Sequence, residues 1–348
     1  MKFAAYILFL FFLFTGFAMP AQKINVLDSL KGVSLRGLCP VDNKVVWASG
    51  SKGYVVRSTN GGKFFSWKQV PGFEKSDFRD IEAFDSLNAV IMSSGTPAVI
   101  LRTENGGKDW KEAYRSNDSA IFLDGMEWMN RGEGFVLGDP VNGQFLLLHT
   151  KDSGKTWANY EHVRYDLKAA KDEAAFAASG TCIRKAGFDG LVIATGGKQS
   201  RILITKYVRH HFFLQSKEVP IIQGKPSTGI FSVAFRGPKI GVVVGGDYLD
   251  DTLTDRNCYY TTDGGNIWIR PKVPPSGYRS CVENINKRMW IATGPGGTDF
   301  SNSKCKKWKR LSKKGFHVVR KAKQGPDIYF SGSDGRIGKL DPDSKLSD

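Results

Sequence analysis

The chain has 348 residues, of which 41% are hydrophobic, 24% charged and 12% aromatic, and 39 are glycine. This composition excludes a disordered chain, and only five cysteines in this length exclude a small fold held together by disulfides. The 50 lysines and arginines against 34 acidic residues give a net charge of +16.

Residues 1–21 have the pattern of a secretory signal peptide. Lys2 precedes an apolar run over 3–18, and small residues follow it. The run is shorter than the ~20 residues of a membrane span, although an uncleaved anchor is the alternative. We therefore expect a periplasmic or secreted protein with no transmembrane span after signal cleavage.

The basic net charge favours particular partners in that compartment. A positively charged surface attracts anionic groups, so we expect an acidic protein or an anionic glycan or envelope component, and no nucleic acid. We expect a monomer. The odd number and irregular spacing of Cys39, Cys182, Cys258, Cys281 and Cys305 predict buried thiols, with one disulfide left open.

A short motif recurs along the chain at 58–65, 103–110, 150–157 and 261–268. It reads Ser/Thr, x, Asp/Asn, x, Gly, x, x, aromatic, and two decayed copies fit at 205–212 and 301–308. The motif, an Asp box, predicts a tight hairpin in which the polar side chain binds backbone amides and glycine supplies a positive φ. Its structural residues are Asn60, Gly62, Phe65, Asn105, Gly107, Trp110, Asp152, Gly154, Trp157, Asp263, Gly265 and Trp268.

Two further strand signals accompany each repeat, and the aromatic positions lie 40 to 56 residues apart. This spacing is typical of four-stranded propeller blades. Seven inner strands are predicted at 35–38, 78–84, 123–128, 175–183, 230–235, 278–282 and 316–319. Second strands are predicted at 45–48, 89–92, 134–137, 191–194, 240–244, 289–292 and 328–330. The sequence therefore predicts an all-β fold: one seven-bladed β-propeller over residues 22–348, of the general WD40/YVTN-like kind.

The last repeat has room for three strands only, while residues 24–27 form a strand candidate ahead of the first repeat. Pairing this N-terminal strand with the last blade would close the ring and cover an exposed sheet edge. We predict that pairing.

Several segments resemble the photosystem II stability/assembly factor family, which has relatives in non-photosynthetic bacteria. They are the Asp boxes together with Leu-Arg-Gly-Leu at 35–38, Phe-Arg-Asp-Ile-Glu at 78–82, 174–180, 229–233, Val-Gly-Gly-Asp-Tyr at 244–248 and Gly-Tyr-Arg-Ser at 277–280. The resemblance implies a propeller that binds partner proteins and is not known as an enzyme. It also implies that the family's arginine-rich surface corresponds to Arg36, Arg79 and Arg279, whereas other blades carry Asp124, Phe231 and His317.

Propeller geometry places the starts of the inner strands around one mouth of the central channel. The candidate ligand-binding residues are Arg36, Arg79, Arg279, His317, Asp124, Asp139 and Asp247. Converging arginines suit a carboxylate or phosphate through paired hydrogen bonds. In the alternative interpretation each arginine pairs with a carboxylate of a neighbouring blade and only holds the ring together.

A sialidase-like glycoside hydrolase is the second functional hypothesis, because three arginines are available for a substrate carboxylate. No Tyr–Glu pair stands out at the expected places, although Glu82 and Tyr278 lie near the arginine positions in sequence. The Arg-Ile-Pro signature of sialidases is missing, since the first blade reads Arg36-Gly-Leu. We predict no catalytic residues, no cofactor and no metal site, because metal-ligand spacings and a dinucleotide-binding context are absent from the sequence.

A basic stretch at 304–323 contains ten lysines and arginines and no acidic residue. A solvated edge is one interpretation, and a carbohydrate- or envelope-binding module is the other. Its residues fall on an outer hairpin, a connection and an inner strand, so we do not expect a single patch.

Overall fold

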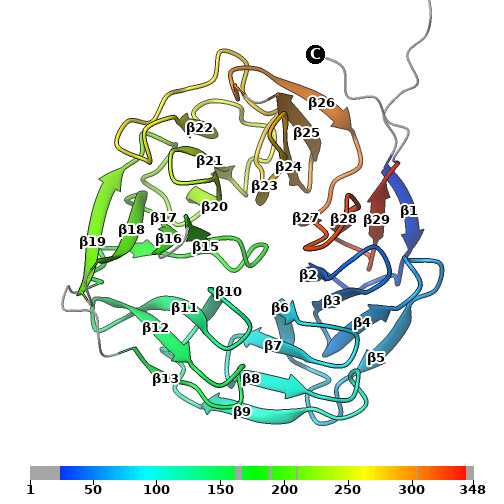
Figure 1. Cartoon of the computed structure of the whole chain (residues 1–348). Coiled ribbons are helices and arrows are strands. Elements are labelled where there is room, and N and C mark those ends of the chain that lie inside the picture. Colours follow the sequence, from blue (N-terminus) through cyan, green and yellow to red (C-terminus); the bar gives the residue numbers. More distant parts are fainter. Residues whose placement is uncertain (1–23, 161–166, 188–189, 209–210, 303, 342–348) are drawn as a thin grey trace, which may run out of the picture.

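A computed structural model describes residues 24–160, 167–187, 190–208, 211–302 and 304–341. Within these residues the chain forms strands and no helix, and hence no helix long and apolar enough to cross a membrane. Seven sheets stand around a common axis (Figure 1). The predicted seven-bladed β-propeller is therefore confirmed, whereas the predicted signal peptide lies outside the described residues.

The first three blades follow one another along the chain, each from the axis outward. Their strands are β2 (Leu35–Pro40), β3 (Val46–Gly50), β4 (Tyr54–Ser58) and β5 (Ser66–Gln69); β6 (Asp77–Ala83), β7 (Ala89–Ser94), β8 (Ala98–Thr103) and β9 (Lys111–Ser116); and β10 (Leu123–Trp128), β11 (Gly134–Val141), β12 (Gln144–Thr150) and β13 (Ala158–Asn159).

The remaining blades are less uniform. Blade 4 contains β15 (Ile183–Ala186), β16 (Gly190–Ala194), β18 (Arg201–Val208) and β19 (His211–Glu218). Blade 5 contains β20 (Thr228–Arg236), β21 (Ile240–Asp247) and β22 (Cys258–Thr261), with the short β14 (Glu173–Ala174) and β17 (Gly196–Gly197) added at its inner edge. Blade 6 contains β23 (Cys281–Asn286), β24 (Met289–Gly294), β25 (Gly297–Asn302) and β26 (Trp308–Ser312).

Blade 7 closes the ring. It contains β27 (Val318–Lys321), β28 (Ile328–Ser331), β29 (Ile337–Leu340) and, as its outer strand, β1 (Ile24–Asp28). Strand β1 pairs antiparallel with β29, and Ile24 lies opposite Leu340. The predicted closure by residues 24–27 is confirmed.

The second strand of a blade contains a continuous hydrophobic run because both of its faces are covered. In β7 the consecutive residues Val90, Ile91 and Met92 are all fully buried, as a strand between two packed sheets requires. Val90 and Met92 pack toward blade 3, and Ile91 packs toward blade 1. The core is therefore a set of hydrophobic layers between neighbouring blades.

The four Asp boxes share one hydrogen-bond pattern. In the third, the Thr150 hydroxyl accepts the amide of Gly154 at 3.0 Å and donates to Asp152 at 2.8 Å. Asp152 in turn accepts the amides of Lys155 and Thr156. Gly154 has a φ of 79°, which favours glycine. These contacts confirm the structural role of the motif.

Blade 4 differs from its prediction. Its inner strand begins at Ile183, so most of the predicted 175–183 strand is instead a connecting segment, 175–182. The decayed motif at 205–212 lies on β18 and β19, which pair antiparallel, with Val208 opposite His211. The Thr205 hydroxyl accepts the amide of Leu191 on the neighbouring strand β16 at 2.8 Å.

Candidate binding site at the upper end of the axis

The inner strands begin around one end of the ring axis, which we call the upper end. Arg36 projects from β2 and Arg79 from β6, each at a bulge in its strand. Arg36 Nη1 donates to the carbonyl of Ala178 at 3.1 Å, and Arg79 Nη1 donates to the carbonyl of Ala177 at 3.4 Å. The two guanidinium groups therefore meet at consecutive carbonyls of one segment.

That segment, residues 175–182, spans the axis. Besides the two arginines of blades 1 and 2, it contacts blade 6 through Ser179 Oγ, which donates to the carbonyl of Ser280 at 2.7 Å. It contacts blade 5 through Thr181 Oγ1, which donates to Ser232 Oγ at 2.6 Å. In Figure 1 this segment reaches from blade 4 toward the middle of the ring. This segment therefore covers the axis at the upper end of the ring.

Gly180 lets the segment approach blade 2. Its φ is 67°, and a Cβ atom there would lie 2.3 Å from the carboxylate carbon of Asp80. Asp80 is buried, and its carboxylate accepts the amides of Ile81 and Met126 at 2.8 Å. Burial raises the pKa of Asp80 well above its usual value, although these two amides oppose the shift.

The two arginines differ in their partners. Arg79 Nε lies 2.7 Å from Asp77 Oδ2, and the Arg79 side chain is 30% exposed. Arg36 has no carboxylate within ion-pair distance among the described residues. Burial, and then the charge of Arg79, lower the pKa of Arg36. Arg36 is therefore a partly buried cation that an anion would stabilise.

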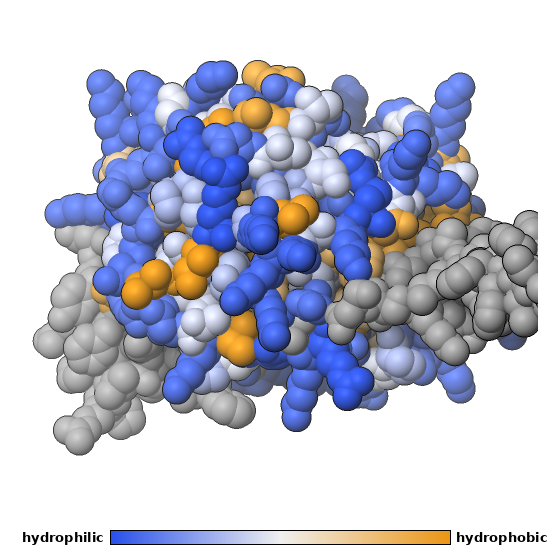
Figure 2. Space-filling view, turned by 90° about the horizontal axis from the view of Figure 1, so that it is seen from above, coloured by the Kyte–Doolittle hydropathy of each residue, from blue (hydrophilic) through white to orange (hydrophobic). Residues whose placement is uncertain are grey.

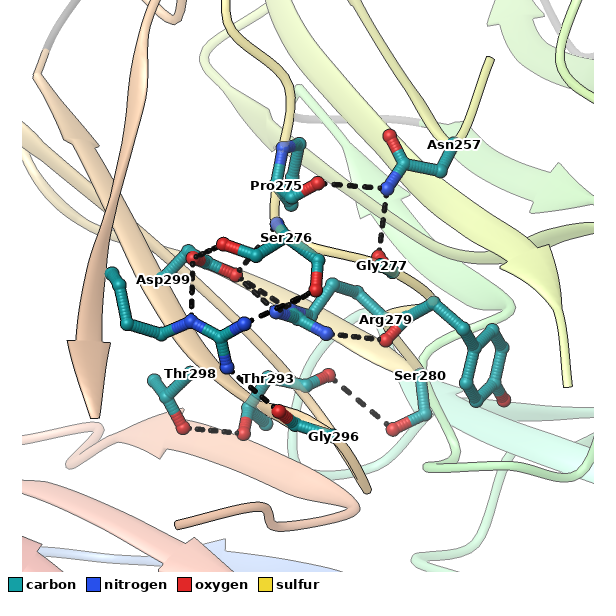
Figure 3. A network of polar contacts seen from close by, with 12 residues as sticks. Asn257, Pro275, Ser276, Gly277, Arg279, Ser280, Thr293, Gly296, Thr298 and Asp299 are labelled. Carbon is teal, nitrogen blue, oxygen red and sulfur yellow. Dashed lines mark hydrogen bonds and ion pairs between the residues drawn. The ribbon is translucent and has the colours of Figure 1, made fainter. Parts of the chain in front are cut away.

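Arg279 does not join these two arginines. Its side chain is fully buried and forms an ion pair with Asp299 of β25, and it also donates to the carbonyls of Ser276 and Tyr278 (Figure 3). Arg310 also reaches this cluster, 3.7 Å from Asp299. In this conformation Arg279 has no surface for a ligand, and its contacts match the structural alternative.

The register of the strands explains this difference. Asp80 and Ser232 each accept an amide of the next blade, from Met126 and Val282. Cys281 does the same for Val319. The position that corresponds to Arg79 is therefore Ser280, and Arg279 lies one residue earlier. Because successive side chains of an extended chain alternate in direction, it points into the blade.

His317 lies close to the arginine pair. It is 6% exposed, and its Nε2 lies 3.1 Å from Ser333 Oγ. Burial lowers its pKa to about 3, and the charges of Arg36, Arg336 and Arg79 contribute. The imidazole is therefore neutral at pH 7, so it can offer a hydrogen bond but no charge.

The three predicted aspartates are placed differently. Asp124 is fully buried, and burial, followed by the charge of Asp139, raises its pKa well above the usual value. Asp139 accepts the amide of Ala175 at 3.0 Å, so both lie beside the axial segment. Asp247 lies apart, 3.7 Å from Lys225 Nζ. Asp124 and Asp139 thus belong to the surroundings of Arg79, while Asp247 is not joined to either arginine.

An aromatic cluster that the sequence did not reveal adjoins Arg36. Phe176 stacks on Phe231 with ring centroids 3.8 Å apart, and Tyr278 meets Phe231 edge-on at 4.8 Å. Tyr248, which is 50% exposed, covers the same ring at 6.1 Å. Burial raises the pKa of Tyr278, and the nearby Arg36 opposes that shift. The upper end therefore combines guanidinium groups with aromatic surface.

The residues considered for a glycosidase do not meet. Tyr278 lies at the upper end, whereas Glu82 lies at the far end of its inner strand and forms an ion pair with Lys323. No group of three or more metal-ligating side chains gathers within the described ranges. The basic stretch at 304–323 is divided as predicted: Arg310 binds the carbonyl of Gly296, while Arg320 lies near Glu283.

Comparison with known proteins supports the family resemblance. The sequence profile described as photosynthesis system II assembly factor YCF48 matches residues 67–170. A search of curated proteins found no significant match.

Three solved structures illustrate the shared fold. A structure described as YCF48 bound to D1 peptide has a TM-score of 0.66 at 13% identity, covering 94% of this chain and all of the other. YCF48 from Cyanidioschyzon merolae has a TM-score of 0.66 at 15% identity, covering 92% and 99%. The WD40 β-propeller domain of Doa1 has a TM-score of 0.61 at 11% identity, covering 92% and 98%. The resemblance to the photosystem II assembly factor family is therefore confirmed: residues 67–170 match its profile, and the ring has the propeller fold of two YCF48 structures.

Proposed function

We propose that this propeller is a non-enzymatic binding and assembly factor that holds a carboxylate-bearing segment of a partner protein at the upper end of the axis. The observation that carries the proposal is Arg36. It is a partly buried guanidinium whose one hydrogen bond among the described residues goes to a neutral carbonyl, that of Ala178.

A carboxylate would complete this arrangement. Hydrogen bonds between a guanidinium and a carboxylate are short and about twice as strong as neutral ones. Arg79 lowers the pKa of Arg36, so an anion between them would relieve their mutual repulsion as well. Asp77 neutralises Arg79 only in part, since both side chains are about 30% exposed (30% and 28%).

The surroundings favour a peptide over a free ion. The aromatic cluster of Phe176, Phe231 and Tyr248 offers apolar surface beside the arginines, and the adjacent Leu249 is 77% exposed. Buried aromatic and arginine side chains carry most of the binding energy at protein interfaces. The structure of YCF48 with a D1 peptide supports a peptide ligand for a propeller of this fold.

The proposed compartment rests on the signal-peptide pattern of residues 1–21. If they direct export, the partner is a periplasmic, envelope or extracellular protein, and the basic net charge would steer acidic segments toward the ring. A fusion of residues 1–21 to a reporter that is active only outside the cytoplasm tests this part separately.

Fluorescence anisotropy with paired peptides tests the binding site. The probes are labelled acidic nonapeptides and their Asn/Gln analogues, each with a free or amidated C-terminus. We expect the charged peptides to bind, and the Arg36→Ala/Arg79→Ala variant to bind them at least about tenfold more weakly. Binding should also weaken as salt rises, because exposed charges are screened over ~8–10 Å.

The matched control is Lys287→Ala/Arg288→Ala, which removes two positive charges from the hairpin between β23 and β24. It should bind the acidic peptides as the unchanged protein does. Equal affinity for charged and amide peptides, or equal loss in the control, would contradict the proposal.

A further inference from the structure

The opposite, lower end of the axis contains a cavity of about 390 Å³. The ends of the inner strands line it, among them β2, β6, β10, β15, β23 and β27. Its volume lies within the range typical of small-molecule sites. Its lining includes neither the arginine pair nor the axial segment 175–182.

Ionisable side chains occupy corresponding positions on these strands, three residues beyond the positions of Arg36 and Arg79. The set comprises Cys39, Glu82, Glu127, Arg184, Glu283 and Arg320. Such a ring of ionisable groups is costly to bury unless its members pair.

Most members do form ion pairs, and these join different blades rather than residues of one blade. Arg184 lies 3.3 Å from Glu127 and 3.0 Å from Glu283. Glu82 pairs with Lys323, which also donates to the carbonyl of Ala83 at 2.9 Å. All three carboxylates therefore have a cationic partner.

The cations are not all satisfied. Arg184 Nη1 is buried and has no hydrogen-bond partner among the described residues. Within the described ranges Arg320 has one ion-pair partner, Glu283 at 3.7 Å. Lys321 lines the cavity and forms no ion pair within the described part of the chain. Five cations and three carboxylates line the cavity in all.

We propose that this cavity binds a small anion through an oxyanion group, either carboxylate or phosphate, held by Arg184, Arg320 and Lys321. The unpaired donors converge on the cavity from blades 4 and 7, and their excess charge is what an oxyanion would neutralise. A planar guanidinium with free N–H groups is suited to two parallel hydrogen bonds with such a group. The proposal is independent of the peptide site at the upper end.

A purely structural clamp is the competing explanation. In that case the charged ring only holds the blades together, and added anions act on the protein no differently from chloride. The two explanations differ in whether a saturable, anion-specific site exists.

Calorimetric titration and thermal unfolding with sodium phosphate and with sodium citrate distinguish them, each compared with sodium chloride at equal ionic strength. We expect saturable binding of at least one of the two anions, with a matching rise in melting temperature. Phosphate binding without citrate binding identifies a phosphate site, and the reverse identifies a carboxylate site.

Arg320→Gln/Lys321→Gln is the decisive variant, because it removes the two least-paired cations and leaves the pairs of Arg184 and Lys323 intact. We expect at least about tenfold weaker anion binding, since charged hydrogen bonds are lost. The control Lys306→Gln/Lys309→Gln removes the same charge from exposed positions and should bind anions normally.

Two outcomes overturn the proposal: no saturable effect beyond that of chloride, or unchanged anion binding in Arg320→Gln/Lys321→Gln. The Arg36→Ala/Arg79→Ala variant should retain anion binding at the lower end. Loss of anion binding in that variant instead would place the anion at the upper end and would also overturn the proposal.

Discussion

At the scale of single residues, the arginines predicted as one set have different roles. Arg36 and Arg79 lie together and donate to neutral carbonyls of the segment 175–182, whereas Arg279 is buried in blade 6 in an ion pair with Asp299. Removing one partner of a fully buried ion pair leaves the other charged and desolvated, which is far more costly than trimming a partly exposed side chain.

We therefore predict that Arg279→Ala lowers the free energy of unfolding by about 3–5 kcal/mol. Arg36→Ala should lower it by less than about 1 kcal/mol. Denaturant unfolding of both variants measures the difference. The double variant Arg279→Met/Asp299→Asn should recover part of the loss, because no uncompensated carboxylate remains. Equal effects of Arg36→Ala and Arg279→Ala would show that Arg279 is not a structural ion pair.

His317 makes stability depend on pH. Its pKa is 6.5 in the unfolded chain and about 3 in the folded state. Between these values the imidazole of the unfolded chain is protonated, whereas that of the folded chain stays neutral. Stability therefore falls as pH drops from 6.5 toward 3, by about 2 kcal/mol at pH 5. Substituting glutamine removes this dependence while keeping a partner for Ser333.

The measurement compares the free energy of unfolding of the unchanged protein and His317→Gln at pH 7.5 and pH 5. The difference between the two proteins should shift in favour of the variant at pH 5. Comparing the pair cancels the contributions of the buried carboxyls Asp80 and Asp124, which both proteins share. A difference that does not change with pH would contradict the assignment.

At the scale of elements, the Asp-box hairpins were predictable because their hydrogen bonds are local. The hydroxyl, the Asp or Asn side chain and the glycine of each box act within five residues, so the sequence alone specifies the geometry. The position of the inner strand of blade 4 was not predictable from the sequence. Contacts with distant blades hold Ser179, Gly180 and Thr181 outside the sheet.

The position of Arg279 was missed for a related reason. Its partner Asp299 lies twenty residues further along, and a one-residue shift of register relative to Arg79 decides its direction. The placement of Arg36, Arg79 and His317 at the upper end was predictable. The inner strands all start at that end of the axis, so the same position of each repeat lies there. The aromatic cluster and the lower cavity depend on which strands face each other across the axis, which repeats alone do not specify.

A substitution within one hairpin tests the Asp-box geometry. We predict that Thr150→Val, which preserves shape, lowers the free energy of unfolding by about 1–3 kcal/mol, because the buried amide of Gly154 loses its acceptor. Thermal or denaturant unfolding measures this. The exposed Lys155→Ala in the same turn is the control and should change little. A neutral Thr150→Val would mean that the hydroxyl is dispensable.

At the scale of the whole molecule, the ring depends on a closure between the two ends of the chain. Strand β1 covers the edge of β29, Ile24 is 3% exposed, and Asp28 accepts the indole N–H of Trp67 at 2.9 Å. The side of the rim seen in Figure 2 is mainly hydrophilic, with small separate hydrophobic patches. Without β1, the edge of β29 would expose unpaired backbone groups that could pair with other chains.

We predict that a chain starting at residue 29 loses at least about 2 kcal/mol of stability through the unburied Ile24 side chain and the lost strand pairing. It should also aggregate, because the edge of β29 becomes free to pair with other chains. Denaturant unfolding and light scattering measure the two effects. Val26→Ser, at a position 38% exposed, is the control. A stable, monodisperse truncated protein would show that closure does not need β1.

Because Ile24 pairs with Leu340, the chain could begin at a different blade without changing the order of the blades around the ring. A short linker could join these neighbouring positions, and the polypeptide could be cut instead in the first Asp-box turn, between the exposed residues Lys63 and Phe64. Circular permutants of this kind would keep every contact between adjacent sheets and move the seam from one sector of the circle to another.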